Sequence, residues 1–123
     1  MKDRINWIDH MGYKILSADY SKLSEPDYIK TMEEVKDELD KLPSEETVLV
    51  MANVTGTKPS MKVRDKGKDV SNAMKRFKGE ANAVIGVTGV MKVLAKTFTS
   101  GMYYAKDESD AKDWLVTQAK KTD

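Results

Sequence analysis

The tripeptide Val-Thr-Gly occurs twice in this chain, at 54–56 and at 87–89, and each copy follows a short apolar run. Evenly apolar runs of this length are typical of strands covered on both faces in a parallel sheet. In open α/β sheets, ligands bind at the carboxyl ends of the strands. The two turns therefore mark the edge of the sheet where we expect a functional site.

Two interpretations of these turns stay open. Backbone N–H groups at two helix starts, with the hydroxyls of Thr55 and Thr88, would bind an anion or a polar head group. Alternatively, each threonine is a helix N-cap and each glycine permits a sharp turn. The candidate binding or phosphorylation surface consists of Asn53, Thr55, Gly56, Thr57, Ser60, Thr88, Gly89 and Met91.

Other residue types that carry chemistry are scarce. His10 is the only histidine and the chain has no cysteine, so a metal site of imidazole and thiolate ligands is not expected. His10 is also far in sequence from any acid–nucleophile pair with which it could act as a catalytic base. Neither Val-Thr-Gly turn continues into the Gly-Lys-Ser/Thr of a P-loop. We therefore expect a protein that is not an enzyme and that holds no metal and no cofactor.

Composition limits the partners of the chain. Its 123 residues carry a net charge of +1, which provides no general attraction to nucleic acid or membrane. No apolar run approaches the roughly 20 residues that span a bilayer, and the charged N-terminus is unlike a signal peptide. We expect a single cytoplasmic domain over residues 1–123, with no nucleic-acid partner and no transmembrane segment.

Charge is nevertheless unevenly distributed along the chain. Residues 58–78 contain eight cationic and two anionic side chains, whereas residues 24–42 contain seven acidic side chains and three lysines. The basic segment would suit an acidic partner protein, an anionic lipid surface or the acidic helix of another copy. A solvated helix face is the alternative explanation.

Periodicity and turn residues predict the elements that position these groups. A hairpin turns at Gly12, a helix runs from Ser24 to the residue before Pro43, and a helix opened by Ser60 ends at Gly79 as its left-handed cap. Thr88 and Asp107 are the expected N-caps of two later helices. The predicted order is ββαβαβαβα, with strands at 5–10, 14–20, 47–54, 83–87 and 102–105 and helices at 24–42, 60–78, 88–98 and 107–119.

Four short motifs occur in a characteristic order: Asp-Tyr-Ser at 19–21, Asn-Val-Thr-Gly at 53–56, Gly-Val-Thr-Gly at 86–89 and Ala-Lys-Asp-Trp-Leu at 111–115. Together they resemble the SpoIIAA-like family across nearly the whole chain. That family is similar in fold to the STAS domains of sulfate transporters and anti-sigma factor antagonists, and is classified near the lipid-binding CRAL-TRIO domains. The resemblance implies an α/β fold with one mixed, mostly parallel sheet of about five strands.

The resemblance also implies a function. In anti-sigma factor antagonists, the turn after the central strand carries an aspartate followed by a phosphorylatable serine. Asn53 stands at the acidic position here, and Thr55, Thr57 or Ser60 would have to accept the phosphate. We expect a regulatory module that binds a partner protein or a second copy of itself. The alternative is a carrier or sensor of an apolar or lipid-like small molecule, with a methionine-rich wall that includes Met91.

Overall fold

The computed structural model describes residues 2–57, 60–87 and 102–122. They form a five-stranded sheet in the order β1-β2-β3-β4-β5, in which β1 and β2 are antiparallel and the other neighbours are parallel. The elements are the 3₁₀ turn η1 (Lys2–Arg4), β1 (Ile5–His10), β2 (Tyr13–Asp19), α1 (Glu25–Asp40), β3 (Thr47–Asn53), α2 (Met61–Met74), β4 (Gly79–Ile85), β5 (Met102–Ala105) and α4 (Glu108–Thr122).

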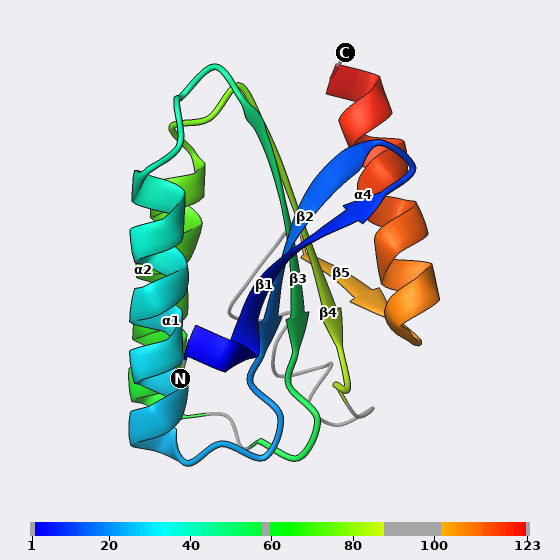
Figure 1. The fold of residues 1–123 in the computed structure, drawn as a ribbon. Coiled ribbons are helices and arrows are strands. Elements are labelled where there is room, and N and C mark those ends of the chain that lie inside the picture. The colour runs from blue at the N-terminus through cyan, green and yellow to red at the C-terminus, as the bar shows by residue number, and fades with distance from the viewer. Residues whose placement is uncertain (1, 58–59, 88–101, 123) are drawn as a thin grey trace.

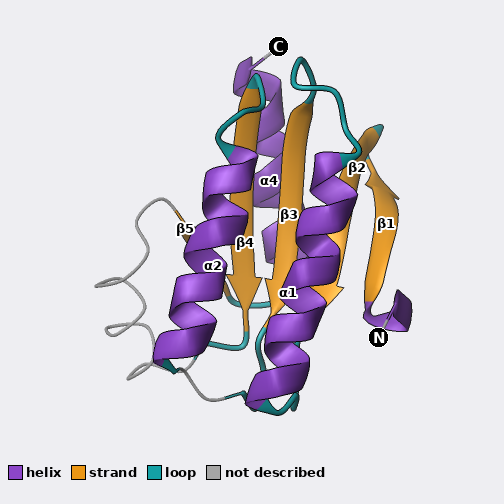
Figure 2. Cartoon of the chain, turned by 90° about the vertical axis from the view of Figure 1, so that its left-hand side faces the viewer, coloured by secondary structure: helices purple, strands orange, loops and turns teal. Residues whose placement is uncertain are grey.

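The sheet lies between two helical layers. Strand order follows chain order, so the crossovers through α1 and α2 step in the same direction across the sheet. Right-handed crossovers that step in one direction must lie on one face, and α1 and α2 accordingly pack side by side there. Helix α4 covers the opposite face (Figures 1 and 2). The α/β class and the mixed, mostly parallel sheet expected from the sequence are confirmed.

Strand β3 contributes to both hydrophobic cores. Val48 and Val50 belong to the core under α1 and α2, and Leu49 and Met51 belong to the core under α4. All four side chains are at most 5% exposed. Alternation of side chains along a strand explains the division, and burial on both faces explains why β3 reads as an uninterrupted apolar run.

One nearby side chain and one distant side chain fix the two ends of α1. The Ser24 hydroxyl accepts a hydrogen bond from the Asp27 backbone N–H at 3.4 Å, as an N-cap does. At the other end, the Arg76 guanidinium donates to the carbonyl oxygens of Leu39 and Leu42 at 2.6 and 2.7 Å. A cation at this position suits the negative end of the helix dipole, and α1 has no basic residue of its own in its last turn.

The hairpin turn was predicted at Gly12, which has a positive φ of 86°. Met11 shares the left-handed conformation, with a φ of 52°, so both central residues of the two-residue turn have the sign that a type I′ turn requires. Directly before the turn, Nε2 of His10 lies 3.0 Å from a carboxylate oxygen of Asp113. This contact joins the hairpin to α4.

The largest differences from the predicted boundaries lie between α2 and β4. Helix α2 ends at Met74, and Gly79 is the first residue of β4, opposite Thr47, rather than a helix cap. The strand expected at 83–87 therefore begins earlier and ends at Ile85. Its start was missed because Asn82 interrupts the apolar run, yet the Asn82 amide donates to the Met74 sulfur at 3.3 Å.

The helix expected at 88–98 lies outside the described residues. None of the helices that the structure does describe has the length and apolar character needed to cross a membrane.

Candidate functional site

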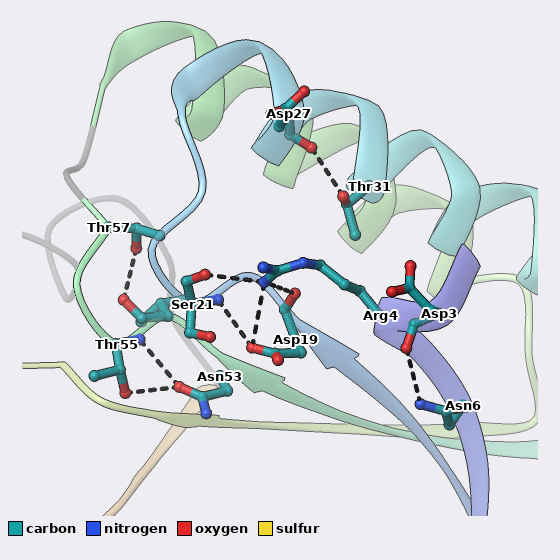
Figure 3. Close-up of polar contacts among 11 residues, drawn as sticks. Asp3, Arg4, Asn6, Asp19, Ser21, Asp27, Thr31, Asn53, Thr55 and Thr57 are labelled. Carbon is teal, nitrogen blue, oxygen red and sulfur yellow. Dashed lines mark hydrogen bonds and ion pairs between the residues drawn. The ribbon is translucent and has the colours of Figure 1, made fainter. Parts of the chain in front are cut away.

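Strands β2, β3 and β4 end level with one another. Asp19 lies beside Asn53, and Asn53 lies beside Ile85. The ladder extends one residue further, because Tyr20 and Val54 donate their N–H groups to the carbonyls of Asn53 and Ile85 at 2.8 and 2.9 Å. The turns that follow leave from one edge of the sheet (Figure 3). We call this surface the carboxyl edge, and it consists of residues 19–22, 53–57 and 85–87.

The Asn53 side chain shapes the turn after β3. Its Oδ1 accepts hydrogen bonds from the Thr55 backbone N–H at 3.0 Å and from the Thr55 hydroxyl at 2.7 Å. This is the Asx-turn arrangement, in which a side-chain carbonyl replaces a backbone acceptor. Thr55 therefore does not cap α2, whose N-cap is Ser60. The helix-capping interpretation of Thr55 is wrong because its hydroxyl is bonded within the turn.

Gly86 lies directly against Thr55. Its φ is +88°, and a Cβ at this position would lie 2.7 Å from the Thr55 nitrogen and 2.8 Å from the Thr55 Cα. On its other side, Thr55 accepts a hydrogen bond at its carbonyl from the Lys22 backbone N–H at 2.9 Å. The turn after β3 is thus held from both neighbouring strands.

The turn after β2 repeats the arrangement with a charged residue. Oδ1 of Asp19 accepts from the Ser21 backbone N–H at 3.0 Å. Arg4 donates to the carbonyl oxygens of Asp19 and Ser21 at 3.2 and 2.9 Å, and lies 3.8 Å from the Asp19 carboxylate. Burial alone would raise the pKa of Asp19, but the hydrogen bonds from Ser21 and the charge of Arg4 outweigh it and lower the pKa below 3.8.

The three expected phosphate acceptors differ in their surroundings. Thr55 is exposed. The Thr57 side chain is buried, with 6% of the residue exposed, and its hydroxyl donates to the Val54 carbonyl at 2.6 Å. The Ser60 hydroxyl accepts from the Val63 N–H at 3.1 Å. Of the remaining candidate residues, Gly56 has a positive φ of 74° beside Lys22, and Thr88, Gly89 and Met91 lie outside the described residues.

The predicted site residues did not include Asp19, Lys22 and Gly86 of the carboxyl edge, or Arg4 of η1, which donates hydrogen bonds to that edge. The motifs at 19–21 and 86–89 contained two of them. The signal for Asp19 was its position, since it ends a strand two residues before a hydroxyl residue, as Asn53 does. Arg4 gave no signal, because its reach to the end of β2 depends on the hairpin bringing η1 there.

The described residues contain no group of three or more histidine, cysteine, aspartate or glutamate residues arranged to hold a metal ion. His10, paired with Asp113, lies at the hairpin end of β1. Strands β2 to β4 end at the opposite side of the sheet (Figure 1), so the structure does not bring His10 to the carboxyl edge.

No protein-family model matches this chain, and a search of curated proteins finds no match. A solved structure does match: an uncharacterised protein of the DUF3478 family from Shewanella loihica PV-4, described as having a SpoIIAA-like fold. The two chains are 22% identical, with a TM-score of 0.62 over 90% of this chain and 91% of the other. The chain therefore has the SpoIIAA-like fold that its motifs predicted. At this identity the likeness establishes the fold alone.

Proposed function

We propose that this chain is a cytoplasmic, non-catalytic interaction module, and that a partner protein docks on the carboxyl edge. One observation carries the proposal: Asp19, Asn53 and Thr55 direct their polar groups to the backbone and side chains of their own turns. Groups committed in this way fix the shape of a surface. The resemblance of the chain to the anti-sigma factor antagonists supports a regulatory role for that surface.

The carboxyl edge has properties that suit docking. A hydrogen bond joins the turns after β2 and β3, because the Lys22 N–H donates to the Thr55 carbonyl. Surfaces ordered before binding lose less entropy when a partner arrives. The side chains of Lys22 and Thr55 are exposed at the junction, so they are the residues that we expect a partner protein to contact.

Carriage of an apolar ligand is the weaker candidate. That candidate places the ligand between the sheet and the methionine-rich helix expected at 88–98, which lies outside the described residues. The described methionines Met32 and Met74 are 5% and 0% exposed and belong to the packed core under α1 and α2. Methionine commonly fills irregular gaps in such cores. The described contacts support docking at the carboxyl edge, whereas the carrier candidate has no described contact in its favour.

Photocrosslinking tests the proposal. A photoreactive amino acid replaces Lys22 in one variant and Lys120, an exposed residue of α4, in a matched control. Both variants are irradiated in the native host, and covalent adducts are identified by mass spectrometry. We expect a specific protein adduct from position 22 that position 120 does not give.

Affinity measurements with the purified adduct partner complete the test. We expect Lys22→Glu to weaken binding about tenfold or more, as removal of a central interface residue does, and Lys120→Glu to leave the dissociation constant unchanged. Melting temperatures of both variants establish that they fold. An identical adduct pattern from positions 22 and 120, or equal affinity for both charge-reversed variants, would contradict docking at the carboxyl edge.

A further inference from the structure

Lys22 is held in a backbone conformation that lysine rarely adopts. Its φ of 58° lies in the left-handed region, and among the described residues Met11 is the only other non-glycine residue with a positive φ. Glycine and asparagine adopt this conformation at lower cost. Such strain persists where the surrounding structure enforces it, and it gathers at functional sites. A lysine at this position therefore indicates that its side chain has a use that outweighs its backbone cost.

The turn after β3 holds both the backbone and the stem of Lys22. The Lys22 N–H donates to the Thr55 carbonyl at 2.9 Å. A Cβ at Gly56 would lie 3.0 Å from the Lys22 Cγ, so the stem of the lysine takes the space that a side chain at position 56 would need. A side chain whose stem is already placed loses less conformational entropy when its end group binds. Gly56 thus positions Lys22 on the surface of the carboxyl edge.

The ammonium of Lys22 has no counter-ion among the described residues, since none of their carboxylates lies within ion-pair distance of it. Asp19, three residues earlier, is paired with Arg4 at 3.8 Å. Glu25 and Asp27 lie in the first turn of α1, where acidic side chains complement the positive end of the helix dipole. The fold therefore leaves Lys22 as an exposed and unpaired cation.

We propose that Lys22 selects the partner that docks on the carboxyl edge, by forming an ion pair with an aspartate or glutamate carboxylate of that partner. This inference rests on the proposed docking function and names the chemistry of the partner at its contact with Lys22. An ion pair enclosed in an interface affects binding more than one at the exposed rim does. A partner with an apolar or cationic group at this point would leave the ammonium desolvated and unpaired, which disfavours that partner.

Carbodiimide coupling tests which group Lys22 contacts, because the reagent joins a lysine amine directly to a carboxylate without a spacer. The partner is the protein identified by photocrosslinking at position 22. Its complex with the unmodified chain is treated with a water-soluble carbodiimide, and the adducts are mapped by mass spectrometry. We expect an amide between Lys22 and an aspartate or glutamate of the partner. Lys22→Arg should retain most of the affinity and lose this adduct, because a guanidinium keeps the charge and does not couple.

Replacement by glycine separates a binding role of Lys22 from a structural one. Lys22→Gly relieves the left-handed strain, so the Tm should stay the same or rise, whereas the dissociation constant for the partner should rise about tenfold or more. Met11→Gly is the matched control, because it relieves the same strain at the hairpin turn. We expect it to leave the dissociation constant unchanged.

The outcomes distinguish this inference from the docking proposal. A position-22 photoadduct together with full affinity in Lys22→Gly overturns the ion pair and leaves docking at the carboxyl edge in place. Contact of Lys22 with a phosphorylated residue of the partner, in place of a carboxylate, also overturns it. If position 22 gives no specific photoadduct, docking fails and the ion pair fails with it.

Discussion

Replacing Gly86 with alanine should destabilise the protein more than the same change at Gly12 or Gly67. An L residue held at the φ of +88° costs roughly 1–2 kcal/mol. The added Cβ would also lie within 2.8 Å of backbone atoms of Thr55, and such overpacking costs typically about 1–3 kcal/mol. The neighbour cannot rotate away, because the overlap is with backbone. We expect a loss of roughly 3 kcal/mol in the free energy of unfolding, or about 10 °C in Tm.

The other two glycines serve as matched controls for the same substitution. Gly12 has a φ of +86°, but no atom lies within 4 Å of the place that a Cβ would take, so Gly12→Ala carries the conformational cost without the overlap. We expect a loss of about 1–2 kcal/mol there. Gly67 lies inside α2 with open space around it, and Gly67→Ala should stabilise the protein by about 0.5–1 kcal/mol.

Urea unfolding and calorimetry of the three variants separate the two costs. The expected order of stability, from highest to lowest, is Gly67→Ala, unmodified chain, Gly12→Ala and Gly86→Ala. The difference between the last two isolates the overlap with Thr55. If Gly86→Ala unfolds at the same urea concentration as Gly12→Ala, the close packing of β4's end against the turn after β3 is refuted.

Charged side chains supply the other predictions. Arg76→Ala removes two hydrogen bonds to the carbonyls of Leu39 and Leu42. We therefore expect the free energy of unfolding, measured in urea, to fall by about 2 kcal/mol. An equal fall in Lys78→Ala, a control at an exposed position, would contradict this expectation. The folded pKa of Asp19 is lowered, so its stabilising contribution is present above its ordinary value of 3.8 and is lost as the pH falls through the folded pKa. The Tm difference between the unmodified chain and Asp19→Asn should therefore shrink from about pH 5 to about pH 2, and a constant difference would refute the assignment.

Elements fixed by nearby residues were predictable from the sequence. Ser24 caps α1 as expected, β5 covers Met102–Ala105 as expected, and Asp107 accepts from the Asp110 N–H at 2.8 Å at the start of α4. In each case the signal and the structure that it specifies lie within a few residues of each other. The α/β class and the mostly parallel sheet were also accessible, because apolar patterning and crossover handedness constrain them.

Features that depend on distant parts of the chain were not predictable. Gly79 resembled a helix cap, yet it begins β4, where a Cβ would lie 2.7 Å from the Thr122 side chain of α4. Thr55 resembled an N-cap because threonine is among the residues preferred at that position. Its hydroxyl is instead bonded to Asn53, and Gly86 of the next strand packs against it. The contacts of Gly79 and Gly86 join residues whose proximity only the assembled sheet determines.

The position of Asn53 also changes what its departure from aspartate means. Asp19 occupies the equivalent place on the neighbouring strand and accepts the same hydrogen bond, from the N–H two residues further on. Amide and carboxylate thus build the same turn, and the substitution alters charge rather than shape. Arg4 already lies against the carboxylate of Asp19, which leaves Lys22 as an exposed cation beside the Thr55 turn. A partner that binds the carboxyl edge therefore contacts a backbone of fixed shape and a locally positive charge. An acidic group on the partner would complement that charge.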